Sequence, residues 1–97
     1  MAAAEDDTVV GQFEWDLEKN RANVLKHGID FGDALQAFSD PAANVVEARW
    51  VDGERRQLII GRAGGMLVSV VFTSRGDRIR LISARRPRAS ERKRYGQ

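Results

Sequence analysis

Apolar positions change their spacing along the chain, and the first changes predict a strand followed by a helix. Phe13 and Trp15 flank a charged residue, which is the alternation expected of a short strand. Residues 17–26 are compatible with a helix that Asp16 can cap and that Gly28 can end in the left-handed conformation. Polar residues of this helix fall three or four positions apart and predict one solvated stripe: Asp16, Asn20, Asn23 and His27.

A second helix and a series of strands follow. Apolar residues at helical spacing, starting at Phe31, predict a helix that Asp30 caps and Asp40-Pro41 ends. From residue 44 to residue 84, apolar runs are separated by turn signals, of which Asp52-Gly53 best fits a tight hairpin. This order predicts an α+β fold: a short N-terminal strand, two helices, an antiparallel meander of about four strands packed on the helices, and a short C-terminal helix.

Length and composition limit the number of domains, the kinds of metal or disulfide site and the location that the sequence allows. With 97 residues, we expect a disordered acidic tail over residues 1–11 and a single domain over residues 12–97. The chain has no cysteine and one histidine, which excludes disulfides, zinc–thiolate sites and multi-histidine metal sites. We therefore expect no cofactor. The sequence has no secretory signal pattern and no apolar run long enough to span a bilayer, which predicts a soluble, cytoplasmic protein.

Positive charge gathers near the C-terminal end, although the net charge is only +2. An apolar run at residues 81–84 leads directly into six cations whose forked or compact donors can grip phosphate: Arg85, Arg86, Arg88, Arg92, Lys93 and Arg94. Tyr95 lies four residues after Glu91 and could stack on a base of single-stranded RNA. The alternative is a solvated C-terminal helix whose charges only aid solubility.

Lys26-His27 is a second candidate site. A histidine can transfer protons near neutral pH, and a lysine can stabilise a pentacovalent phosphate. The alternative is that His27 only serves the free carbonyl groups at the end of its helix. No pair of carboxylates in the sequence suggests two-metal hydrolysis.

The same residues resemble a known family. In order along residues 13–95, the motifs are similar to those of the BrnT family of bacterial type II toxins: Phe13-x-Trp15-Asp16-x-x-Lys19, Asn23-x-x-Lys26-His27-Gly28-Ile29-x-Phe31, Phe38-x-Asp40-Pro41, Glu54-Arg55, Gly61, and Ile82-Ser83-Ala84-Arg85-Arg86 through Glu91 and Tyr95. The resemblance implies a RelE/ParE-like fold and a ribonuclease activity that inhibits translation. It also implies neutralisation by a BrnA-type antitoxin with a ribbon-helix-helix domain, through which alone the complex would bind operator DNA.

Residues and resemblance together give a hypothesis of metal-independent cleavage, in which the 2′-hydroxyl of the RNA is the nucleophile. The scissile phosphate would be held by Arg85, Arg86 and Lys26. Protons would be transferred by His27, Glu91 or Tyr95. Further contacts with RNA are expected from Arg55, Arg88, Arg92, Lys93 and Arg94. The alternative is a non-catalytic module that binds nucleic acid or a partner, or a gyrase-type poison, on the same fold. The active-site hypothesis requires these groups to converge in space.

Overall fold

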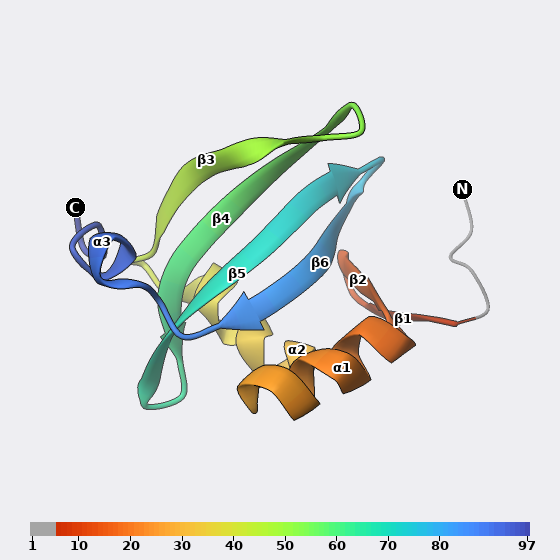
Figure 1. The fold of residues 1–97 in the computed structure, drawn as a ribbon, viewed down its shortest axis with the longest axis horizontal. Helices are drawn as coiled ribbons and strands as arrows, with labels where there is room; N and C mark the ends of the chain where they lie inside the picture. Colours follow the sequence, from red (N-terminus) through yellow and green to blue (C-terminus); the bar gives the residue numbers. More distant parts are fainter. Residues whose placement is uncertain (1–5) are drawn as a thin grey trace.

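The chain folds around a six-stranded mixed sheet with short helices (Figure 1). The computed structural model describes residues 6–97. The strands are β1 (Asp7–Val10), β2 (Phe13–Asp16), β3 (Asn44–Val51), β4 (Glu54–Ala63), β5 (Met66–Arg75) and β6 (Arg78–Arg85), and they lie in the order β1-β2-β6-β5-β4-β3. The helices are α1 (Leu17–His27), α2 (Phe31–Ala34), the 3-10 helix η1 (Leu35–Ser39) and α3 (Ala89–Arg92). Among these helices, none is long and apolar enough to cross a membrane.

The predicted meander is confirmed, because β3 to β6 pair in succession and antiparallel. Asp52 and Gly53 have φ values of 51° and 77°, the positive values that a tight two-residue hairpin turn requires. The predicted N-terminal strand is β2, which pairs in parallel with β6. The sheet is larger than predicted, since β1 adds a further antiparallel strand beside β2.

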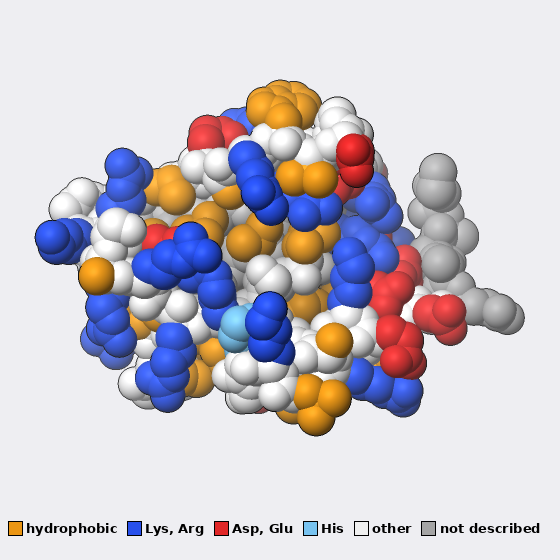
Figure 2. Space-filling view, in the orientation of Figure 1, with side chains coloured by type: hydrophobic (Ala, Val, Ile, Leu, Met, Phe, Trp, Pro, Cys, Tyr) orange, Lys and Arg blue, Asp and Glu red, His pale blue; other side chains and the backbone are white. Residues whose placement is uncertain are grey.

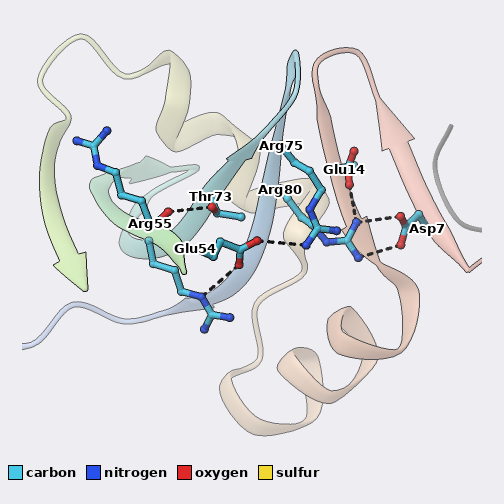
Figure 3. Close-up of polar contacts among 8 residues, drawn as sticks. Asp7, Glu14, Glu54, Arg55, Thr73, Arg75 and Arg80 are labelled. Carbon is cyan, nitrogen blue, oxygen red and sulfur yellow. Dashed lines mark hydrogen bonds and ion pairs between the residues drawn. The ribbon is translucent and has the colours of Figure 1, made fainter. Parts of the chain in front are cut away.

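The prediction of a disordered tail over residues 1–11 is wrong for residues 7–10, which form β1. Gly11, with φ of 58°, turns the chain from β1 back into β2. Arg80 donates to both carboxylate oxygens of Asp7, at 2.9 and 3.0 Å, and to Glu14 at 2.5 Å (Figure 3). The acidic character of this segment thus contributes to its order, because its carboxylate pairs with an arginine 73 residues later. Residues 1–5 of the predicted tail lie outside the described residues.

Helix α1 has the predicted ends. Asp16 caps it by accepting a hydrogen bond from the Lys19 amide at 3.0 Å. Gly28 follows the helix with φ of 71° and donates its amide to the carbonyl oxygen of Val24 at 2.8 Å. Glycine adopts this conformation without steric cost, so the helix ends here.

The polar stripe of α1 faces inward at Asn20 and Asn23, so the prediction of a solvated face is wrong there. The Asn23 amide group donates to the carbonyl oxygens of Ile29 and Ala84, each at 2.8 Å, and its oxygen accepts from the Ala84 amide at 3.1 Å. The Asn20 oxygen accepts from the Phe31 amide at 2.9 Å. These side chains serve backbone groups that would otherwise be buried without partners, and they attach α1 to β6.

The second predicted helix is a single α-helical turn, α2, that continues as η1. Asp30 caps α2 through a 2.7 Å bond from the Gly32 amide. The segment then lies so close to β4 that a Cβ atom at Gly61 would be 2.8 Å from the carbonyl oxygen of Ala37. Between the helices and the sheet lies the apolar core: Trp15, Ile29, Phe31, Ala34, Ala37, Ile59, Ala63, Val68, Val70, Phe72, Leu81 and Ala84.

Two β-bulges shape the opposite face of the sheet. In β6, Ile82 is an extra residue opposite the step from Val71 to Phe72. In β3, Ala48 is an extra residue opposite the step from Arg56 to Gln57. A bulge bends its strand and increases the local twist, so this face becomes concave rather than flat.

The C-terminal segment crosses one end of the concave face and is tied to the start of β3. It contains α3, so the predicted short C-terminal helix is present. The Tyr95 hydroxyl donates to Asp40 at 2.8 Å, and the Gly96 amide donates to the Ala42 carbonyl at 3.1 Å. These bonds hold α3 beside the strand ends, where its side chains can contribute to a site.

Candidate nucleic-acid interface and active site

The concave face of the sheet holds a groove of about 500 Å³. Figure 2 shows apolar side chains in the middle of this face, surrounded by Lys and Arg side chains. A floor of this kind can receive a base, while the cations can receive the phosphate backbone. The groove is lined by Val46, Glu47, Ala48, Arg49, Arg56, Leu58, Val71, Ile82, Ser83, Arg85, Arg88 and Glu91.

Arg85 stands at the end of β6 and is fixed in direction by Glu91. Its Nη1 and Nη2 atoms lie 2.8 and 3.0 Å from the two carboxylate oxygens of Glu91. One of these oxygens also accepts from the Ser69 hydroxyl and from the Arg88 amide, each at 2.9 Å. The bond from Arg85 is the largest cause that lowers the pKa of Glu91 to about 2, despite the opposing effect of burial. Glu91 is therefore ionised at neutral pH and orients the guanidinium group.

Arg56 lines the same groove and was missed by sequence reasoning. Its Nε atom is buried and has no hydrogen-bond partner among residues 6–97; the nearest carboxylate oxygen, from Glu54, is 3.6 Å away. Arg49 pairs with Arg56 across the β3–β4 ladder, so two guanidinium groups lie on this face. A buried donor without a partner costs free energy, which an anion bound in the groove would recover.

Arg55 does not lie in this groove, although the sequence hypothesis placed it among the RNA contacts. Successive residues of a strand point to opposite faces, so Arg55 and Arg56 are separated by the sheet. Arg55 instead forms a two-point ion pair with Glu47, which raises the pKa of Arg55. The hairpin turn at Asp52-Gly53 sets the register that brings Glu47 and Arg55 together. The sequence alone does not show which residues of β4 face the core, because residues 58–60 are all apolar.

Comparison with known families shows to which protein family the chain that carries this groove belongs. A model of the family described as "ribonuclease toxin, BrnT, of type II toxin-antitoxin system" matches residues 15–91. The chain belongs to the BrnT family. The resemblance seen in the sequence is thereby confirmed, and no curated protein matches the chain. The BrnT match spans every residue that lines the groove, whereas β1 and Tyr95 fall outside it.

Lys26 and His27 end α1 beside the end of β6, because Asn23, one turn earlier, bonds to Ala84. Figure 2 shows the one histidine of the chain on the same face as the groove, among Lys and Arg side chains. Lys26 is exposed and His27 is partly buried, and neither lines the groove itself. In this BrnT-family chain the Lys26-His27 pair therefore lies near Arg85, at one end of the groove, and not within the groove. Arg86 is also exposed there.

Tyr95 is directed away from Arg85, toward Asp40. Its hydroxyl bonds to Asp40, which is the largest cause that raises the pKa of Tyr95, and the Arg62 guanidinium lies 5.7 Å from its ring centroid. A tyrosine held in this way remains protonated at neutral pH. The structure does not bring Tyr95 into the groove. The remaining predicted RNA contacts lie on the exposed surface of α3 and the turn after it: Arg92, Lys93 and Arg94.

Proposed function

We propose that this BrnT-family chain is a metal-independent endoribonuclease on a RelE-like scaffold, and that it inhibits translation by cleaving RNA in the cytoplasm. The observation that carries the proposal is the pair of arginines in the groove. Arg85 is oriented by Glu91, and the buried Arg56 Nε atom has no hydrogen-bond partner among residues 6–97. Preorganised cations of this kind stabilise the charge that develops on a phosphate during transfer.

RNA carries its own nucleophile, so the protein needs to align the reacting groups and move protons. In the proposed reaction the 2′-oxygen attacks phosphorus and the bond from phosphorus to the 5′-oxygen breaks. The 2′-hydroxyl gives up its proton, and the leaving 5′-oxygen gains one. Arg85 and Arg56 would hold the non-bridging oxygens throughout, and Lys26 and Arg86 would contact the flanking backbone.

His27 is the residue to which we assign proton transfer. Glu91 has a pKa of about 2 and bonds to three donor residues, so it is a weak base that positions Arg85. Tyr95 is bonded to Asp40 outside the groove. Histidine can both accept and donate a proton, and His27 lies on the groove face (Figure 2).

The partner in this proposal is a BrnA-like antitoxin with a ribbon-helix-helix domain, encoded by the adjacent gene. Membership of a type II toxin–antitoxin family implies an antitoxin. The complex would be a hetero-oligomer that binds operator DNA only through the antitoxin. Coexpression should prevent the growth arrest that the chain causes alone, and harmless expression of the chain would contradict a toxin.

The test is incubation of the purified protein with labelled RNA, with and without EDTA. We expect cleavage in both reactions, with 2′,3′-cyclic phosphate ends, and strongly reduced cleavage after the substitution Arg85→Ala. Intact RNA at high protein concentration would favour a non-catalytic binding module, and cleavage that EDTA abolishes would contradict metal independence. A gyrase supercoiling assay in parallel identifies a gyrase poison, which would leave the RNA intact.

A further inference from the structure

Helix α1 presents apolar side chains to solvent. Leu25 is 90% exposed, and Val24 and Leu17 are 40% and 38% exposed. The side that packs on the protein is formed instead by Asn20 and Asn23. A surface helix of a globular protein normally has the opposite arrangement, with apolar residues inward and polar residues outward.

The exposed apolar residues form one stripe with Arg21, because positions 17, 21, 24 and 25 are spaced by four, seven and eight residues. The helix cannot rotate to bury this stripe while Asn20 and Asn23 bond to backbone groups of α2 and β6. In Figure 2, apolar side chains appear along the edge that α1 occupies in Figure 1. Exposed apolar stripes rimmed by polar residues mark sites of protein–protein interaction.

We infer that this outward face of α1 is the docking surface for the antitoxin, and that the segment which binds it carries apolar side chains together with carboxylates. The inference rests on the antitoxin partnership of the proposed function. Exposed charges on α1 favour an acidic partner, because three cations accompany a single carboxylate: Lys19, Arg21 and Lys26 against Glu18. A second copy fits less well, because Arg21 is paired with Glu18 and a two-fold pair would then bring together the two remaining cations of each helix, Lys19 and Lys26.

The position of this face gives the inference a functional consequence. The stripe ends at Leu25, directly before Lys26 and His27. An antitoxin segment that lies along α1 would therefore reach the end of the groove at Arg85 and would cover the arginines that line the groove. Binding energy would come from α1, whereas inhibition would come from the cover over the groove.

The test measures the affinity of the full-length chain for the purified antitoxin encoded by the adjacent gene, by titration calorimetry. Leu25→Glu should weaken binding by about 30-fold or more, since it puts a charge at the centre of an apolar contact. Arg21→Glu should also weaken binding, through repulsion of the acidic partner. Val10→Glu is the matched control, because Val10 is 47% exposed but lies on β1. RNA cleavage by Leu25→Glu should equal that of the wild type.

Equal affinity of the wild type, Leu25→Glu and Arg21→Glu would overturn the inference while leaving the antitoxin partnership in place. Failure of the wild-type chain to bind the antitoxin would overturn both, whatever the RNA assay shows. A wild-type dimer that Leu25→Glu converts to a monomer without antitoxin would assign the face to a second copy and would also overturn the inference. Should circular dichroism show that Leu25→Glu is misfolded, Arg21→Glu decides the matter.

Discussion

Arg80 and Arg85 belong to the same strand, β6, but they have different surroundings. Arg80 bonds to two buried carboxylates, Asp7 and Glu14, and the bond to Asp7 is the largest cause that raises its pKa (Figure 3). Arg85 bonds to one carboxylate, Glu91. The groove around Arg85 is lined by three further arginines, at positions 49, 56 and 88, and by Glu47, whose carboxylate pairs with Arg55.

The ratio of cations to carboxylates therefore separates the two regions. Around Arg80 two guanidinium groups face two carboxylates, because Arg78 also lies 4.0 Å from Glu14, so no excess of positive charge attracts a phosphate and the cluster serves stability. In the groove the cations are in excess, so the local field favours an anion. The same residue type on one strand thus acts as a structural anchor at one end and as a candidate phosphate ligand at the other.

Removal of the anchor should have the largest effect. Arg80→Ala removes the cation that bonds to both buried carboxylates, which should lower the free energy of unfolding by about 3–5 kcal/mol. Urea denaturation followed by circular dichroism measures this change. Arg75→Ala is the control, because its ion pair with Glu54 is half exposed and should change stability by less than about 1 kcal/mol. Equal losses in the two variants would remove the distinction between a buried anchor and a surface pair.

Removal of the candidate phosphate ligand should act mainly on activity. Arg85→Ala should lower kcat/KM for RNA cleavage by about 100- to 1,000-fold, which is typical for loss of a preorganised donor to a developing charge. Arg85→Lys should retain an intermediate activity, because it keeps the charge but loses the forked geometry. Activity within a few-fold of wild type in Arg85→Ala would move the site elsewhere.

The two faces of β4 offer a finer test. Arg56→Ala should lower kcat/KM by about 10- to 100-fold, because a charged donor to the phosphate is lost. Arg55→Ala, one residue away on the other face, should have a clearly smaller effect in the same RNA cleavage assay. A larger loss in Arg55→Ala would contradict the assignment of the groove to the active site.

The smallest expected effect is a dependence of stability on pH that comes from Glu91. Its pKa is about 2 in the folded chain, below the value of about 4.3 expected in the unfolded chain. The stabilisation is therefore complete above about pH 4.5 and is lost as the pH falls toward 2, by about 1–2 kcal/mol after allowance for partial solvent screening. Urea denaturation of Glu91→Gln, compared with wild type over this pH range, should show a flatter profile. Parallel profiles would show that Glu91 does not couple to folding.

Much of the fold could be predicted because its signals are local. Asp16 and Gly28 bound α1, and Asp52-Gly53 turns β3 into β4, through backbone conformations that these residue types favour. The acidic start of the chain was misjudged because Asp7 is ordered by Arg80, which no local pattern reveals. The polar stripe of α1 was wrongly predicted to face solvent for a similar reason, because Asn23 hydrogen-bonds to Ala84 on the distant strand β6.

The candidate site could be predicted only in part. A basic cluster after an apolar strand indicated Arg85. Glu91 was expected among the groups that transfer protons, whereas the structure pairs its carboxylate with Arg85. The position of Arg56 in the groove could not be predicted, because the consecutive apolar residues of β4 do not show which of its residues face the core and which face the groove. Tyr95 was placed with Glu91 by helical spacing, but α3 ends at Arg92, so that spacing does not apply.

The bulge at Ile82 has a consequence for how this chain can change over evolution. Arg80 and Arg85 are five positions apart, and in a regular strand an odd separation would send their side chains to opposite faces. The extra residue restores a common face, so the groove depends on the number of residues in β6 as well as on their identity. Loss of one codon between positions 80 and 85 would turn Arg85 toward the core, whereas many point substitutions at Ile82 would leave its direction unchanged. Homologues should therefore vary in sequence here but not in length.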